Sequence, residues 1–299
     1  MISYTAIFWS FLIFLIPSII CSLFVLYHLL FDRTLRHGLH NHVIIIVLII
    51  GLICDVTLYP WMLYYYRYDG KWNRSPIFCI IWVFIDWGLY ITHTVLFSWA
   101  TIERHILIFH DQWVSTKIKR FFVHYLPLIA LLFYCLIFYL VLDFFPSCEN
   151  LFLDFNIICV YLCVRQIYAL TVWETIGHQI IPVFTILIFS IALFMRVLWQ
   201  KHRVNQPIQW RKYRKMTIQL LSISFLYLIF FFPATFMTLM YMCGLSYEIG
   251  ADFYEYTNFF SYYMILLLPF VCVLSLPELR TKSMNILHLR RQVRHIVPT

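Results

Sequence analysis

Long apolar stretches separated by short polar segments dominate the sequence. A helix needs roughly 20 apolar residues to cross a hydrocarbon core about 30 Å thick. Seven stretches reach that length, and they cover residues 4–30, 43–66, 77–109, 121–142, 171–199, 216–242 and 254–276. The pattern predicts an all-α integral membrane protein in which residues 1–299 form a single seven-transmembrane helix bundle. We expect the first stretch to be a retained helix, because no basic residue precedes it and it is too long for the apolar core of a signal peptide.

Two further segments affect the number of helices. Residues 157–173 are apolar enough to suggest an eighth span, but Arg165 lies near the middle of that stretch, where a charge is costly in lipid. An eighth span would also move the basic cluster at 211–215 to the other side of the membrane. Residues 277–288 begin with a proline and carry basic residues. They predict a short amphipathic eighth helix on an anionic inner leaflet.

The distribution of basic residues predicts the orientation. Eighteen of the 22 Lys and Arg residues lie in or beside the segments after the first, third and fifth predicted helices or in the tail, and the other four lie on the opposite side. Because basic segments stay in the cytoplasm, we expect an extracellular amino terminus and a cytoplasmic carboxyl terminus in the plasma membrane.

Composition supports a lipid environment. With 63% hydrophobic and 12% charged residues, the chain has too little polar surface to cover itself in water. The net charge of +8 does not indicate a nucleic-acid partner, because the basic residues lie between apolar stretches rather than on one wettable face. Membrane lipid is the expected surrounding partner.

The third predicted helix carries two distinctive residues at opposite ends. Cys79 precedes Arg104 by 25 residues, about 38 Å at 1.5 Å per residue, and Arg104 lies in the triplet Glu103-Arg104-His105. Prolines interrupt four other helices, at Pro60, Pro182, Pro233 and Pro269. In these features the chain resembles the rhodopsin-like class of G-protein-coupled receptors, as a divergent member.

The resemblance implies a receptor that binds an extracellular ligand and activates a heterotrimeric G protein. It implies no enzymatic activity, no cofactor and no metal. The residues that would couple to the G protein, with Arg104 pairing with the adjacent acid at rest, are Glu103, Arg104, His105 and Lys215. The hinges about which helices would swing on activation are Phe231, Pro233 and Pro269.

The resemblance also implies a ligand pocket. Asp86, eighteen residues before Arg104, matches the acid that pairs with the ligand cation in amine receptors of the family, and Tyr262 matches its usual tyrosine neighbour. Glu174 and His178 would face the same pocket from the fifth helix. The alternative is that Asp86 only hydrogen-bonds a neighbouring tyrosine or tryptophan. Acidic residues outnumber basic ones in the predicted outer segments. A cationic ligand is therefore expected, either a basic peptide of the FMRFamide-like neuropeptide type or an amine.

The outer cysteines predict a disulfide. By the resemblance Cys79 pairs with one of Cys148, Cys159 and Cys163 in the loop after the fourth helix; Cys159 is favoured, and spacing alone does not decide. Asn73 begins a glycosylation sequon, whose use is disfavoured by the following proline and by the nearby membrane.

The chain departs from the family at several motifs. Gly51 stands where the second helix has an aspartate, and His93 replaces a small polar residue of the sodium pocket, so that pocket is expected to be absent. The sixth and seventh helices read Phe-Phe-Phe-Pro and Leu-Pro-Phe-Val-Cys at 230–233 and 268–272. These replace the family's Cys-Trp-x-Pro and Asn-Pro-x-x-Tyr motifs.

Two other function classes were weighed. A transporter or channel would fit a multi-span chain, but repeat symmetry is not evident. A membrane enzyme would need catalytic groups within the membrane or at its edge. Three histidines in the first basic loop resemble part of a metal site: His37, His40 and His42. Further clusters of the kind that a di-iron site needs are not evident.

Overall fold

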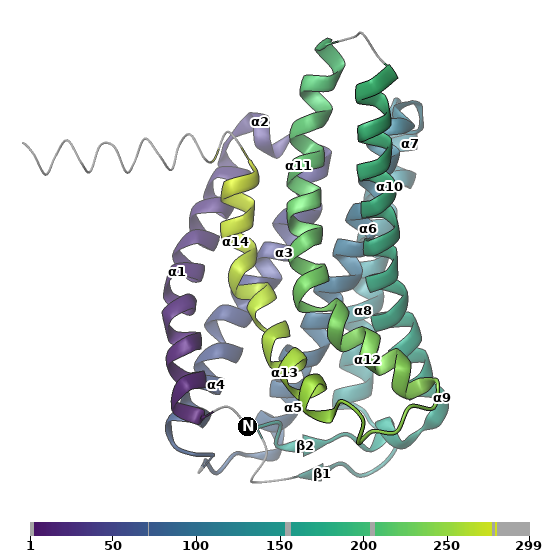
Figure 1. The fold of residues 1–299 in the computed structure, drawn as a ribbon. Helices are drawn as coiled ribbons and strands as arrows, with labels where there is room; N and C mark the ends of the chain where they lie inside the picture. The colour runs from purple at the N-terminus through teal and green to yellow at the C-terminus, as the bar shows by residue number, and fades with distance from the viewer. Residues whose placement is uncertain (1–2, 71, 153–156, 204–206, 277–278, 280–299) are drawn as a thin grey trace, which may run out of the picture.

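The computed structural model describes residues 3–70, 72–152, 157–203, 207–276 and 279 (Figure 1). These residues contain five helices that are long and apolar enough to cross a membrane, and up to seven spans if each of two bent helix pairs counts as one. The predicted short helix at 277–288 lies outside the described residues, apart from Leu279.

The five continuous spans are close to the first five predicted stretches. Four of them are built from more than one helical segment, because the chain changes its hydrogen-bonding pattern inside the span. In order, the segments are α1 (Tyr4–Phe31); α3 (Leu39–Val56) and α4 (Leu58–Arg67); α5 (Pro76–Val83), η1 (Phe84–Leu89) and α6 (Tyr90–Phe109); α7 (Lys117–Arg120), η3 (Phe121–Tyr125) and α8 (Leu126–Phe144); and α9 (Tyr168–Trp173), η5 (Glu174–Ile180) and α10 (Ile181–Arg203). Short helices α2 (Arg33–Arg36) and η2 (Asp111–Val114) join neighbouring spans.

The segments η1, η3 and η5 are π-helical. A π segment holds more residues per turn than an α-helix and is commonly found at functional sites. Each of the three carries a polar residue discussed below: Asp86 in η1, His124 in η3 and His178 in η5.

The first bent pair joins α11 (Pro207–Phe230) to α12 (Phe232–Met242) at an angle of 49°. The break falls at Phe231, two residues before Pro233. Because proline has no backbone N–H, the helix loses a hydrogen bond at this point. The predicted hinge residues Phe231 and Pro233 therefore lie at an observed bend.

The second bent pair joins α13 (Ala251–Ser261) to α14 (Tyr263–Ser275) at 45°. The break falls at Tyr262, whereas Pro269 lies inside α14. The break therefore lies before Pro269, and the hinge role of Pro269 stays a prediction. At the break, the Tyr262 carbonyl accepts a hydrogen bond from the Tyr59 hydroxyl at 2.5 Å.

A small antiparallel hairpin lies across one end of the bundle (Figure 1). Its strands are β1 (Leu151–Phe152) and β2 (Val160–Tyr161), and α1 begins at the same end. We name this the hairpin end, and the opposite end, where α10 and α11 extend furthest, the Arg104 end. The apolar stretch at 157–173 contains β2, the short helix η4 (Cys163–Gln166) and α9. It is therefore not an eighth span.

The outer surface of the bundle is strongly apolar. On α1 alone, Ile13 and Ile20 are each 64% exposed, and only 33% of the most apolar part of that helix is buried. A monomeric protein in water does not expose so large an apolar surface. The chain is therefore embedded in a membrane, with its polar residues gathered inside the bundle.

Candidate functional site

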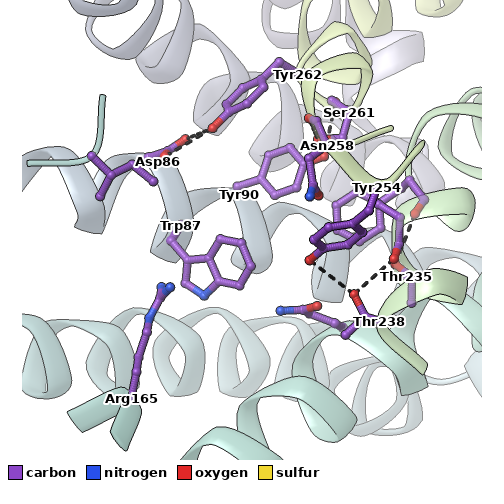
Figure 2. Close-up of a pocket in the computed structure, with 14 residues that line it drawn as sticks. Asp86, Trp87, Tyr90, Arg165, Thr235, Thr238, Tyr254, Asn258, Ser261 and Tyr262 are labelled. Carbon is purple, nitrogen blue, oxygen red and sulfur yellow. Dashed lines mark hydrogen bonds between the residues drawn. The ribbon is translucent and has the colours of Figure 1, made fainter. Parts of the chain in front are cut away.

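A cavity of about 340 Å³ opens near the hairpin end of the bundle. Figure 2 shows its polar residues converging from separate segments. Its size lies at the lower end of the range of about 300–1,000 Å³ for small-molecule sites. The lining comes from η1, α6, η5, α12, α13 and the hairpin loop and comprises Asp86, Trp87, Tyr90, Ile158, Arg165, Gln179, Phe231, Ala234, Thr235, Thr238, Tyr254, Asn258, Ser261 and Tyr262.

Asp86 and Tyr262, the predicted pair, meet on the cavity wall. The Tyr262 hydroxyl donates to the Asp86 carboxylate, with distances of 3.0 and 3.3 Å to its two oxygens (Figure 2). Asp86 is only 5% exposed, and Tyr262 is the residue at which the last span breaks. The contact therefore links the third span to the bend between α13 and α14.

A second charged residue, Arg165, reaches the cavity from η4. Its guanidinium lies over the Trp87 ring, 4.9 Å from the centroid, while the indole N–H of Trp87 donates to Glu174. Glu174 itself does not line the cavity, so its predicted role becomes that of a support for Trp87. From the sequence, Arg165 was expected only as a charge that disfavours an eighth span. The feature of the sequence that could have placed Arg165 near the cavity is its position two residues after Cys163, which lies in the disulfide-bonded loop.

His178 does not face the cavity, contrary to expectation. Its two ring nitrogens lie 2.9 Å from the Tyr134 hydroxyl and 3.1 Å from the Tyr139 hydroxyl, both on α8. The next residue, Gln179, lines the cavity in its place. The difference arises from the π turn of η5, because the α-helical spacing assumed from sequence places side chains on a different face.

Neutral polar groups form the wall opposite η1. They come from α12 and α13 at spacings of three or four residues, which is one face of each helix. The Thr238 hydroxyl donates to the Ala234 carbonyl at 3.0 Å and lies 3.5 Å from the Tyr254 hydroxyl. These residues were not predicted from the sequence, although their helical periodicity is visible in it.

Two disulfides fix the loop that lines the cavity at the hairpin end. Cys79 at the start of the third span is bonded to Cys159, and Cys148 is bonded to Cys163. Ile158 and Arg165, which flank these cysteines, are the loop residues that line the cavity. Arg74 adds a third tie by donating to the Ile157 carbonyl at 2.7 Å.

Asn73 is exposed beside this tie, so the sequon asparagine is accessible.

At the other end, Arg104 is buried and joins three spans. It donates to the His40 carbonyl at 3.0 Å and to the Gln219 side-chain oxygen on α11 at 3.2 Å. The Glu103 carboxylate contacts His124, whose ring in turn lies 2.9 Å from His42. Among the described residues, Glu103 therefore contacts His124 rather than forming an ion pair with Arg104. The reason is that η3 brings His124 directly against Glu103.

The two other residues predicted to couple to the G protein are His105 and Lys215. His105 packs its ring against Phe109 and Phe189. The side chain of Lys215 lies outside the described residues. Within the same described part of the chain, His37, His40 and His42 do not belong to any group of three or more ligands that could hold a metal ion.

Halfway along the bundle, His93 and Tyr227 connect α6 to α11, and Asp55 accepts a hydrogen bond from Ser18 at 2.8 Å. All four residues are fully buried. They form the polar interior between the cavity and Arg104.

No protein-family model matches the sequence, and a comparison with curated proteins finds no significant match.

Proposed function

We propose that this chain is a divergent rhodopsin-like G-protein-coupled receptor of the plasma membrane, with seven spans and a short eighth helix. The observation that carries the proposal is the third span. It bears the Cys79 disulfide and Asp86 at the cavity, and it bears Arg104, buried among three spans, at the other end. This is the arrangement that a signal from one side of a membrane to the other requires.

Chemistry at the two ends supports an orientation. Disulfides persist in an oxidising compartment, which favours an extracellular hairpin end. Most of the basic residues belong to the segments of the Arg104 end, which favours a cytoplasmic position for that end. The cavity is then open to extracellular ligands, and Arg104 faces a heterotrimeric G protein.

The contacts of the described residues give a route between the ends. A ligand cation that binds Asp86 competes with the Tyr262 hydroxyl and frees the bend between α13 and α14. Phe231 lines the same cavity at the bend between α11 and α12. Movement there carries Gln219 on α11 away from Arg104, which then becomes available to the G protein.

The proposal is tested with the purified full chain in lipid nanodiscs. Guanine-nucleotide exchange is measured on G proteins of each class, at high receptor density so that ligand-independent activity is detected. We expect faster exchange on at least one G protein and loss of that effect in Arg104→Ala. Lys117→Ala is the matched control, because Lys117 is an exposed cation near the same end. Exchange that is absent for every G protein, or unchanged in Arg104→Ala, contradicts the proposal.

A further inference from the structure

The cavity contains two opposite charges that do not pair with each other. Asp86 and Arg165 both line it, and Figure 2 shows the Trp87 side chain between them. From this arrangement we infer that the ligand is a small zwitterion, with an ammonium group at Asp86 and a carboxylate at Arg165. The inference rests on the proposed function and narrows the expected ligand class, which the sequence alone left as a basic peptide or an amine.

The Asp86 side of the cavity requires a cation. Its carboxylate is almost fully buried, and its partner among the described residues is the neutral hydroxyl of Tyr262. A buried carboxylate with only a neutral donor has an unmet demand for positive charge. A ligand ammonium meets that demand and forms a charge-assisted hydrogen bond.

The Arg165 side requires an anion. Its guanidinium has five N–H donors and lies over the face of the Trp87 ring. The carboxylates of Asp86 and Asp143 are near enough to attract it electrostatically, but among the described residues neither forms an ion pair with it. Trp87 is held in place at its edge, because its indole N–H donates to Glu174. The guanidinium is thus oriented by an aromatic surface while its donors remain available for a carboxylate, which it binds in a bidentate manner.

The rest of the cavity limits the size and the body of the ligand. A volume of about 340 Å³ suits a small molecule and is too small to enclose a folded peptide. Aromatic rings from three segments line it, including Tyr90, Phe231 and Tyr254. An apolar or aromatic skeleton between the two charged groups fits such a surface.

A ligand with one charge leaves the other residue unsatisfied. An amine leaves the half-buried Arg165 with water in place of a charged acceptor, and a carboxylic acid leaves Asp86 without a cation while adding a second negative charge. Specificity for the zwitterion over both analogues follows from these penalties.

The experiment uses matched sets of three compounds that share a skeleton. One set is tryptophan, tryptamine and indole-3-propionate, and the other is 5-aminovalerate, pentylamine and pentanoate. Binding is measured as thermal stabilisation of the purified full chain in nanodiscs, without G protein. We expect the zwitterion of at least one set to bind about tenfold or more tightly than its amine and its acid, the factor given by one hydrogen bond to a charged group.

Variants assign the effect to Arg165. Arg165→Gln is expected to lower the affinity for the zwitterion to that of the matched amine, and Arg165→Lys is expected to retain part of the preference. Arg67→Gln is the matched control, because Arg67 is an exposed arginine at the end of α4 that does not line the cavity. Equal affinities for zwitterion and amine, an unchanged preference in Arg165→Gln, or no stabilisation by either zwitterion would overturn the inference.

The two proposals fail in different ways. Stabilisation by a zwitterion without any G-protein exchange would contradict the receptor function and leave the ligand class standing. Exchange that is stimulated by amines and not by zwitterions would contradict the ligand class and leave the receptor function standing.

Discussion

The hydroxyl of Tyr227 lies 2.6 Å from Nδ1 of His93, and both side chains are fully buried. The Tyr227 ring also stacks on Phe97, with centroids 4.2 Å apart and an interplanar angle of 2°. The Tyr227 carbonyl accepts from the Phe231 N–H at 2.8 Å, so this contact lies one helical turn from the 49° bend. It ties α11 to α6 between the cavity and Arg104.

Removing that tie is expected to raise activity without ligand. In Tyr227→Phe the stack on Phe97 is kept and the hydrogen bond to His93 is lost, so α11 is held less firmly against α6. We expect basal nucleotide exchange to rise severalfold while the free energy of unfolding falls by only about 1 kcal/mol. Tyr27→Phe serves as the control, because Tyr27 is 59% exposed on α1. Unchanged or reduced basal exchange in Tyr227→Phe would count against a restraining role.

Asp86 is expected to set ligand affinity. Asp86→Asn keeps the shape of the side chain and removes its charge, so we expect the dissociation constant of the preferred ligand to rise by about 10–100-fold. Tyr262→Phe should have a smaller effect, because it removes only a neutral partner. The measurement is thermal-shift titration of variants with equal surface expression. Glu248→Gln is the control, because Glu248 is an exposed acid in the segment between α12 and α13. It tests whether the general acidity of this surface accounts for the ligand affinity. If Glu248→Gln weakened binding as much as Asp86→Asn, the specific role of Asp86 would be lost.

The two disulfides are expected to differ in their effect on stability. The Cys79–Cys159 bond spans 80 residues and the Cys148–Cys163 bond spans 15. In the chain-entropy model the longer loop stabilises by about 1.5 kcal/mol more. Thermal unfolding should therefore show a larger loss for Cys79→Ser than for Cys148→Ser. Cys243→Ser, at an exposed free cysteine, should be neutral. A reversed order of the two losses would contradict this expectation.

The neutral partner of Arg104 is expected to control basal signalling. Gln219→Glu replaces the amide oxygen at 3.2 Å by a carboxylate, which binds the guanidinium more strongly. We expect basal exchange to fall by about fivefold or more, and Gln219→Leu to raise it. Gln112→Glu adds the same charge at an exposed position near that end and controls for the change in net charge. An equal effect of Gln112→Glu would show that the contact with Arg104 is not responsible.

The sequence predicts those parts of the fold that depend on length and hydrophobicity. The first predicted stretch, residues 4–30, is within one residue of α1, because lipid imposes a strict apolar length on a span. The meeting of Asp86 with Tyr262 was also expected, because the resemblance to rhodopsin-like receptors implies that these two positions are neighbours. Orientation, ligand and G-protein coupling remain predictions.

What the sequence did not predict depends on local backbone geometry and on long-range contacts. The π turns carry no compositional signature, so the direction of His178 was wrong. The bend at Tyr262 depends on Tyr59, which is distant in the chain and close in space. Arg165 lies at the cavity because two disulfides hold its loop there. The spacing of the cysteines in the sequence does not determine which of them pair.

The π segment η1 lets the third span hold one residue more than a regular helix would, with little change of register. An α-helix turns the chain by about 100° per residue, and a π-helix, which has more residues per turn, turns it by less. The residues from Phe84 to Leu89 therefore turn the chain about as far as one residue fewer would in an α-helix. Deleting one of them would let the span relax to a regular helix and would leave Cys79 on nearly the same side relative to Arg104. Deleting a residue from the α-helical part between Tyr90 and Arg104 would instead rotate the half-cystine away from Cys159 by about 100°. A lost codon is therefore tolerated in η1 and not in the rest of the span.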